Sequence, residues 1–184
     1  MYSSETVTLS RAVIGTLIPA GTPVELPEGA AATITQSLGG SFTIVTDGHM
    51  FRIEGKDADA LGKEIAAGPD VASDASDAEL EKAAWDQLHT CYDPEIPVDI
   101  VELGLVYECK LEPLDGENKG KRKAVVRMTL TAPGCGMGEV LVGDVRSKLL
   151  QVPTVTEADV QMVFDPPWTR DMMSEAAKLQ TGMF

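Results

Sequence analysis

The residues best suited to chemistry lie at 131–138, where the sequence Thr-Ala-Pro-Gly-Cys-Gly-Met-Gly places Cys135 among glycines. Residues 124–131 alternate apolar and polar side chains as a strand does, and residues 139–151 repeat apolar side chains at four-residue spacing as a helix does. Helix N-termini carry unpaired N–H groups and a partial positive charge, which would stabilise a thiolate at Cys135 and lower the pKa of the thiol. A thiolate is both a nucleophile and a soft metal ligand, so the segment predicts one of these two chemistries.

The glycines around Cys135 strengthen this interpretation. Gly134 and Gly136 allow backbone angles that other residues avoid, and they leave N–H groups that could face an anion. The alternative is an ordinary tight turn in which the cysteine is incidental, because a motif match alone carries a false-positive risk.

The other two cysteines predict packing rather than chemistry. Cys109 alternates with apolar residues on a predicted strand, which is typical of a small buried hydrophobe. Cys91 ends a predicted helix, near enough to the predicted cluster to be a second thiol, but packing is again the favoured role. The sequence contains no Cys-x-x-Cys pair, which argues against a disulfide framework or a self-contained zinc site and favours reduced thiols.

Three carboxylates and one histidine are candidates to support the thiol. Asp93 and Glu95, in Asp-Pro-Glu-Ile-Pro, could act as hard ligands or as a base, or could only end a helix and begin a turn. Asp165 precedes two prolines and could do no more than hold a turn. His89 is the histidine that could serve Cys135 as a base, but the sequence shows no partner that would orient it, and a surface or capping role is favoured.

The expected strands bring these candidates to one place. Residues 105–111 and 124–131 predict an antiparallel pair, and residues 155–164 predict a strand parallel to the second through a right-handed helical crossover. The loops beside these strands then lie at the same edge of the sheet. We therefore predict that the residues they carry cluster in space: Asp93, Thr131, Cys135 and Asp165.

The predicted fold class is α+β, with a small β-barrel or meander over residues 1–68, a linker at 69–76 and an α/β domain over 77–184. The second domain has the element order α-β-β-α-β-α and a three-stranded mixed sheet.

Local signals place most of the elements. In the first region, strand-like runs lie at 13–18, 33–38, 41–46 and 49–53, and Asp47-Gly48 predicts a two-residue hairpin turn. In the second region, Ser76 with Glu79 forms the capping box of a helix that ends near Thr90. The last helix is expected over 169–181, with Gly182 as its stop.

The charge balance excludes some classes of partner. The 184 residues include 29 acidic and 15 basic side chains, for a net charge of −14, which would repel phosphate backbones and anionic lipid surfaces. We therefore expect neither nucleic acid nor membranes as partners. No apolar run approaches the about 20 residues of a membrane span, and the first residues lack the basic start and apolar stretch of a secretion signal, so a cytoplasmic location is expected.

Four segments in order resemble the family of small metal-sulfur cluster assembly domains, which includes the PaaD protein of phenylacetate degradation. They are Asp-Pro-Glu-Ile-Pro-Val at 93–98, Leu-Gly-Leu-Val-Tyr at 103–107, Met-Thr-Leu-Thr-Ala-Pro-Gly-Cys at 128–135, and Asp-Pro-Pro-Trp at 165–168 with Met173-Ser174 beyond. The β-rich region before them resembles an extension that some members of the family carry.

The resemblance implies a function and a set of site residues. It implies a factor that assembles or matures iron-sulfur clusters and helps to deliver them to client proteins, rather than an enzyme. The implied partners are assembly scaffold or carrier proteins and apo client proteins. The functional positions carry over as Asp93, Thr131 and Cys135, and Gly136 stands where many relatives have proline, which implies a more flexible thiol loop.

The residues themselves limit the mechanism. One thiolate cannot hold an iron-sulfur cluster, because such clusters usually take four protein ligands, mostly cysteine. A cluster or iron would therefore be bound transiently by Cys135, shared across a homodimer, or completed by a partner or a small thiol. In this hypothesis Asp93 is a second ligand or helps to form the thiolate, and Thr131 donates a hydrogen bond that shapes the loop.

Two other classes of function stay open. A non-catalytic adaptor would dock cluster carriers to clients, with the cysteine secondary. A cysteine-dependent hydrolase or transferase would use the same thiol as its nucleophile, but it requires a positioned base.

Overall fold

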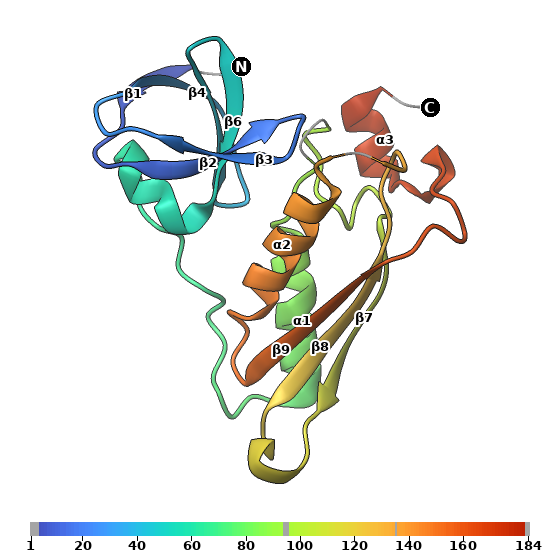
Figure 1. Cartoon of the computed structure of the whole chain (residues 1–184). Helices are drawn as coiled ribbons and strands as arrows, with labels where there is room; N and C mark the ends of the chain where they lie inside the picture. The colour runs from blue at the N-terminus through green and yellow to red at the C-terminus, as the bar shows by residue number, and fades with distance from the viewer. Residues whose placement is uncertain (1–3, 94–95, 135, 183–184) are drawn as a thin grey trace. The chain divides into compact units, whose positions relative to one another are not determined.

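The computed structural model describes residues 4–93, 96–134 and 136–182 (Figure 1). Its contacts divide the chain into two compact units, Met1–Ala67 and Gly68–Phe184. Residues 63–76 form neither helix nor strand. Val71 and Ala75, which the sequence assigned to a linker, pack against the core of the second unit. The separate linker at 69–76 and the domain limits remain predictions.

The first unit is a six-stranded antiparallel sheet with the strand order β1-β4-β5-β6-β2-β3. Its strands are β1 (Glu5–Thr8), β2 (Val13–Ile18), β3 (Thr22–Leu26), β4 (Ala31–Leu38), β5 (Ser41–Thr46) and β6 (His49–Ile53), followed by the 3-10 helix Gly55–Leu61. Strands β1 and β3 were not predicted from the sequence. Strands β2, β5 and β6 have the predicted bounds, and β4 begins two residues earlier than predicted.

Alternation along these strands builds the core of the first unit. One face of the sheet and the 3-10 helix enclose buried apolar side chains, among them Ile34, Phe42, Ile44, Ile53 and Leu61. Asp47 and Gly48 have φ angles of 50° and 75° and join β5 to β6 with Thr46 opposite His49. These are the positive φ values that a two-residue hairpin turn requires, so the predicted turn is confirmed.

The second unit has the predicted element order. It contains α1 (Asp77–Leu88), β7 (Val106–Pro113), β8 (Arg122–Met128), α2 (Gly138–Leu149), β9 (Val155–Met162) and α3 (Glu175–Thr181), with short 3-10 turns at Gly116–Asn118 and Arg170–Met172. The sheet order is β7-β8-β9, with β7 antiparallel and β9 parallel to β8. The mixed three-stranded sheet is therefore confirmed, and α1 and α2 pack together on one of its faces (Figure 1).

The start of α1 follows the predicted capping box. The Ser76 Oγ accepts the N–H of Glu79, and the Glu79 carboxylate accepts the N–H of Ser76 at 2.8 Å. The hydrogen bonds from the Ser76 side chain and backbone lower the pKa of Glu79 below its usual value. The three α-helices have 12, 12 and 7 residues, and in the part of the chain described, no helix is long and apolar enough to cross a membrane.

Several predicted elements end or begin elsewhere than expected. Strand β8 ends at Met128 instead of Thr131, β9 ends at Met162 instead of Phe164, and α2 ends at Leu149 instead of Gln151. The last helix begins at Glu175 instead of Thr169, because Met173 is extended, with a ψ of 146°, and separates a short 3-10 turn from α3. Ser174 caps the new start by accepting the N–H of Ala177 at 3.0 Å, and Gly182 ends the helix with a φ of 68°, as predicted.

Gly104 provides a test of how the end of the chain packs on the second unit. Its φ is 72°, and a Cβ atom there would lie 2.2 Å from the carbonyl oxygen of Met172. Gly116 has nearly the same φ, 69°, but a Cβ atom there would meet nothing within 4 Å. The two glycines therefore separate backbone strain from steric overlap.

We expect Gly104→Ala to lower the free energy of unfolding of the second unit by about 3 kcal/mol, about 1 from the left-handed backbone and about 2 from overpacking. We expect Gly116→Ala to lower it by about 1 kcal/mol. The measurement is denaturant unfolding followed by tryptophan fluorescence, because both tryptophans of the chain, Trp85 and Trp168, belong to this unit. Equal losses in the two variants would show that the overlap with Met172 has no cost.

Candidate functional site

One edge of the three-stranded sheet gathers the loops that the sequence analysis singled out. The N–H of Thr129, just after β8, donates to the carbonyl of Leu105, just before β7, at 2.8 Å. The N–H of Val163, just after β9, donates to the carbonyl of Met128 at 2.8 Å. The chain therefore enters β7 and leaves β8 and β9 at this edge.

The loop before β7 is organised by Asp93. This carboxylate is 6% exposed, and its Oδ1 accepts the N–H of Ile96 at 2.9 Å. The N–H of Asp93 donates to the carbonyl of Val98 at 3.3 Å. Asp93 thus binds the backbone of both Ile96 and Val98, as expected of the turn that is one of the two roles predicted from its position before proline. Glu95, the second candidate in this motif, lies outside the described residues.

A second carboxylate, Asp99, was missed in the sequence. Its Oδ1 accepts the N–H groups of Val101 and Glu102, each at 3.0 Å, and lies 3.2 Å from Nδ1 of His89. An aspartate that accepts N–H groups two and three residues ahead is a local turn signal that the sequence did contain. His89 therefore has a partner that can orient its ring, which the sequence did not show. The absence of such a partner no longer counts against a cysteine-dependent hydrolase or transferase.

Cys135 lies outside the described residues, but the residues around it account for two of the glycines. Gly134 is exposed with a φ of 82°, a conformation that favours glycine. Gly138 is the first residue of α2, and a Cβ atom there would lie 2.9 Å from a methyl group of Leu130. Thr131 is half-buried in a bend, and Gly136 is exposed. The start of α2 therefore packs closely against the end of the segment that leaves β8.

The Asp165 turn is held against the start of β7. Asp165 is exposed and forms a cis peptide bond with Pro166, whose carbonyl accepts the hydroxyl of Tyr107 at 2.7 Å. The Nε1 of Trp168 donates to the carbonyl of Leu103 at 2.7 Å, and its side chain packs against the core. The turn is thus tied to β7 by one hydrogen bond and to the loop before β7 by another. The wider cluster of Asp93, Thr131, Cys135 and Asp165 remains a prediction.

The other two thiols are part of the core. Cys91 is 0% and Cys109 is 6% exposed. Burial, with a smaller effect of the Glu81 carboxylate, raises the pKa of Cys109 to about 11, so this thiol stays protonated at neutral pH. Among the residues described, no group of three or more His, Cys, Asp or Glu side chains could hold a metal ion.

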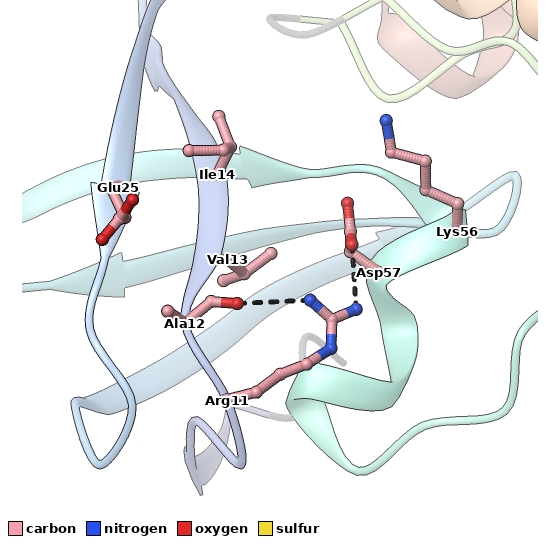
Figure 2. A pocket seen from close by; sticks show the side chains of 7 residues that line it. All are labelled: Arg11, Ala12, Val13, Ile14, Glu25, Lys56 and Asp57. Atoms are coloured by element: carbon pink, nitrogen blue, oxygen red, sulfur yellow. Dashed lines mark hydrogen bonds and ion pairs between the residues drawn. The ribbon is translucent and has the colours of Figure 1, made fainter.

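The first unit carries a pocket of about 310 Å³ (Figure 2). Arg11 at its wall donates to Asp57 at 2.9 Å and to Asp59 at 2.6 and 2.8 Å, and these two carboxylates raise the pKa of the guanidinium, Asp59 more than Asp57. Lys56 forms an ion pair with Glu54 at 2.9 Å. Both cations of the pocket are paired within the protein, so their charges are largely compensated.

The second unit is thus a small α+β domain with two helices on one face of a mixed sheet and three motif-bearing loops at one edge. A family model described as "Iron-sulfur cluster assembly protein" matches residues 81–160. The chain is 40% identical over 91 residues to the Fe-S protein maturation auxiliary factor SufT of Staphylococcus aureus. The matched segment covers 50% of this chain and 96% of that protein. The chain belongs to the iron-sulfur cluster assembly protein family.

Two further relatives carry similar names. The chain is 41% identical over 104 residues to the Fe-S protein maturation auxiliary factor YitW of Bacillus subtilis, covering 56% of this chain and 95% of that one. It is 42% identical over 95 residues to an Fe-S protein maturation auxiliary factor of Porphyromonas gingivalis, covering 52% and 84%. The matched segments make up nearly the whole length of the S. aureus and B. subtilis proteins. These two relatives therefore have no room for an extension like the one that residues 1–68 were predicted to resemble.

The predicted closeness of Asp93 and Cys135 can be tested by titration. A carboxylate near a thiol disfavours the thiolate and raises the pKa of the thiol. We expect Asp93→Asn, which keeps an oxygen that can accept the N–H of Ile96, to shift the midpoint of Cys135 alkylation to lower pH by about 1 unit. Mass spectrometry of iodoacetamide-treated protein would follow Cys135 while Cys91 and Cys109 stay buried.

Asp115→Asn is the matched control for this titration, because Asp115 lies in the β7–β8 connection, at the opposite edge of the sheet. This variant is expected to leave the midpoint unchanged. The same midpoint in wild type and Asp93→Asn would place the carboxylate too far from the thiol to act on it.

Proposed function

We propose that this protein is an iron-sulfur cluster maturation factor that helps to deliver clusters to client proteins and uses the thiol of Cys135 to do so. One observation carries the proposal: the chain covers nearly the whole length of relatives named Fe-S protein maturation auxiliary factors at about 40% identity. Those names describe auxiliary factors, and we propose that this chain likewise acts without catalysing a metabolic reaction.

The proposed role of Cys135 is that of a transient ligand. An iron-sulfur cluster usually takes four protein ligands, whereas the described residues contain no metal-binding group of three His, Cys, Asp or Glu side chains. In the proposal the cluster or iron is cargo, and its other ligands come from a carrier or client protein, a small thiol or a second copy of this chain. A cluster or iron that is incompletely coordinated by this protein is easily transferred, because the receiving protein can supply the remaining ligands.

The neighbouring residues have supporting roles in this proposal. The Asp93 carboxylate, with one oxygen held by the N–H of Ile96, serves as an oxygen ligand. The alternative role, in which Asp93 helps to form the thiolate, predicts that Asp93→Asn shifts the midpoint of Cys135 alkylation to higher pH instead of lower. Thr131 donates a hydrogen bond that shapes the cysteine loop. Gly134 and Gly136 allow the loop its backbone conformation, and Asp165 holds the turn beside it.

The charge of the chain supports protein partners of a particular kind. With a net charge of −14, the chain would be attracted to basic surfaces and would repel nucleic acid and anionic lipid. We propose scaffold or carrier proteins and apo client proteins as partners, in the cytoplasm.

The second candidate function is a non-catalytic adaptor that docks carriers to clients. The absence of a metal-binding group among the described residues favours it, because an adaptor needs no ligand of its own. The two proposals differ in one respect, which is whether Cys135 is required.

We expect Cys135→Ser to abolish support of client maturation in cells that lack the wild-type protein, because a hydroxyl is a poor ligand for iron at neutral pH. The measurement is the activity of a cluster-dependent enzyme in those cells, corrected for the amount of folded factor. Cys109→Ala, which removes a thiol from the core, is the control, and it should retain support after that correction.

A Cys135→Ser variant that supports clients as well as wild type would overturn the thiol role. If it also captured the same partners, the adaptor would be the better proposal. Iron and sulfide analysis after anaerobic purification would separate the two proposals further. Equal and negligible metal in wild type and Cys135→Ser would again favour the adaptor.

A further inference from the structure

The end of the chain holds the loop that carries Asp93. We call residues 92–104 the acidic loop and residues 163–182 the C-terminal strap. The strap donates hydrogen bonds to three carbonyl groups of the acidic loop: from Gln180 Nε2 to Pro97 at 3.0 Å, from the N–H of Ser174 to Glu102 at 2.9 Å, and from Trp168 Nε1 to Leu103 at 2.7 Å.

The contact of Gln180 differs from the other two in what it holds. Pro97 stands between Ile96, whose N–H donates to the Asp93 carboxylate, and Val98, whose carbonyl accepts the N–H of Asp93. The carbonyl that Gln180 binds is therefore inside the turn that Asp93 closes. The contacts at Glu102 and Leu103 lie beyond this turn, next to β7.

Gln180 is also poorly placed to stabilise the fold. Its side chain is exposed on α3, whereas the strap is anchored in the core by Met173 and Ala177, which are 3% and 1% exposed. A neutral hydrogen bond at the surface contributes modestly to stability. Loss of the Gln180 amide would leave these anchors, and the bonds of Trp168 and Ser174, in place.

We propose that Gln180 is a positioning residue, which holds the turn of the acidic loop through Pro97 and thereby sets the position of the Asp93 carboxylate. The C-terminal strap then has two parts: a structural part around Trp168 and Ser174 that closes the domain, and α3, which acts on the site. The inference rests on the proposed function, in which Asp93 serves Cys135.

Three variants test the role of Gln180. Gln180→Leu keeps the approximate size of the side chain and removes the donor. Gln180→His restores a donor at a similar reach and is neutral above pH 7. Gln161→Leu is the matched control, because Gln161 is an exposed residue of β9 whose Nε2 also makes one hydrogen bond, to Asp159 at 3.2 Å.

Two measurements that need no client protein are made on each variant. Amide hydrogen exchange at Ile96 reports the turn, and the pH midpoint of Cys135 alkylation reports the Asp93 carboxylate. In Gln180→Leu we expect exchange at Ile96 to rise about fivefold, as the loss of one modest hydrogen bond implies. We expect the alkylation midpoint to move toward that of Asp93→Asn. Gln180→His should restore both values, and Gln161→Leu should change neither.

Several outcomes would overturn the inference. Unchanged exchange at Ile96 in Gln180→Leu would show that the contact does not hold the turn. Faster exchange with an unchanged midpoint would show that the turn does not position the carboxylate. Faster exchange also at Val126, in the buried strand β8, would assign Gln180 to general stability. By contrast, support of clients by Cys135→Ser would overturn the proposed function and would leave these measurements as they are.

Discussion

The pairing of β8 with a neighbour on each side is the constraint on which the second unit depends. Ala124, Val126 and Met128 of this strand are all 0% exposed, so a shift of its register by one residue would turn an apolar row away from the core. With β7 antiparallel and β9 parallel to it, the chain must bring the entry to β7 and the exits of β8 and β9 to one edge. The place of the candidate site is therefore a consequence of strand direction.

The backbone N–H and carbonyl groups of the acidic loop at that edge find hydrogen-bond partners from two sources. Its own carboxylates, Asp93 and Asp99, accept N–H groups within the loop, while the C-terminal strap donates to the carbonyls of Pro97, Glu102 and Leu103. Unpaired backbone groups in a buried loop are costly. The two sources complement each other, because the carboxylates pair with N–H groups and the strap pairs with carbonyl groups. The described part of this segment, which contains no helix or strand, thus takes some of its hydrogen bonds from residues far along the chain, Trp168, Ser174 and Gln180.

Predictions from the sequence succeeded where a local pattern decides the structure. The alternation of β2, β5 and β6, the turn at Asp47-Gly48 and the capping box at Ser76 all act within a few residues. The two missed strands are the edges of their sheet, where β1 is only four residues long and β3 contains Pro23, a residue that edge strands tolerate. The contact between Gln180 and Pro97 joins residues 83 apart, so no local pattern could indicate it. Of the candidate site, the shared edge was predictable, whereas Asp99 was visible only as a turn signal.

The burial of Cys91 and Cys109 has a consequence for the behaviour of the protein in air and peroxide. Oxidation of cysteine begins from the thiolate and depends on access, and both conditions are unfavourable for Cys109, which burial keeps protonated. Cys91 is inaccessible in the same core. Oxidative damage to the domain would therefore spare the thiols that support its folding.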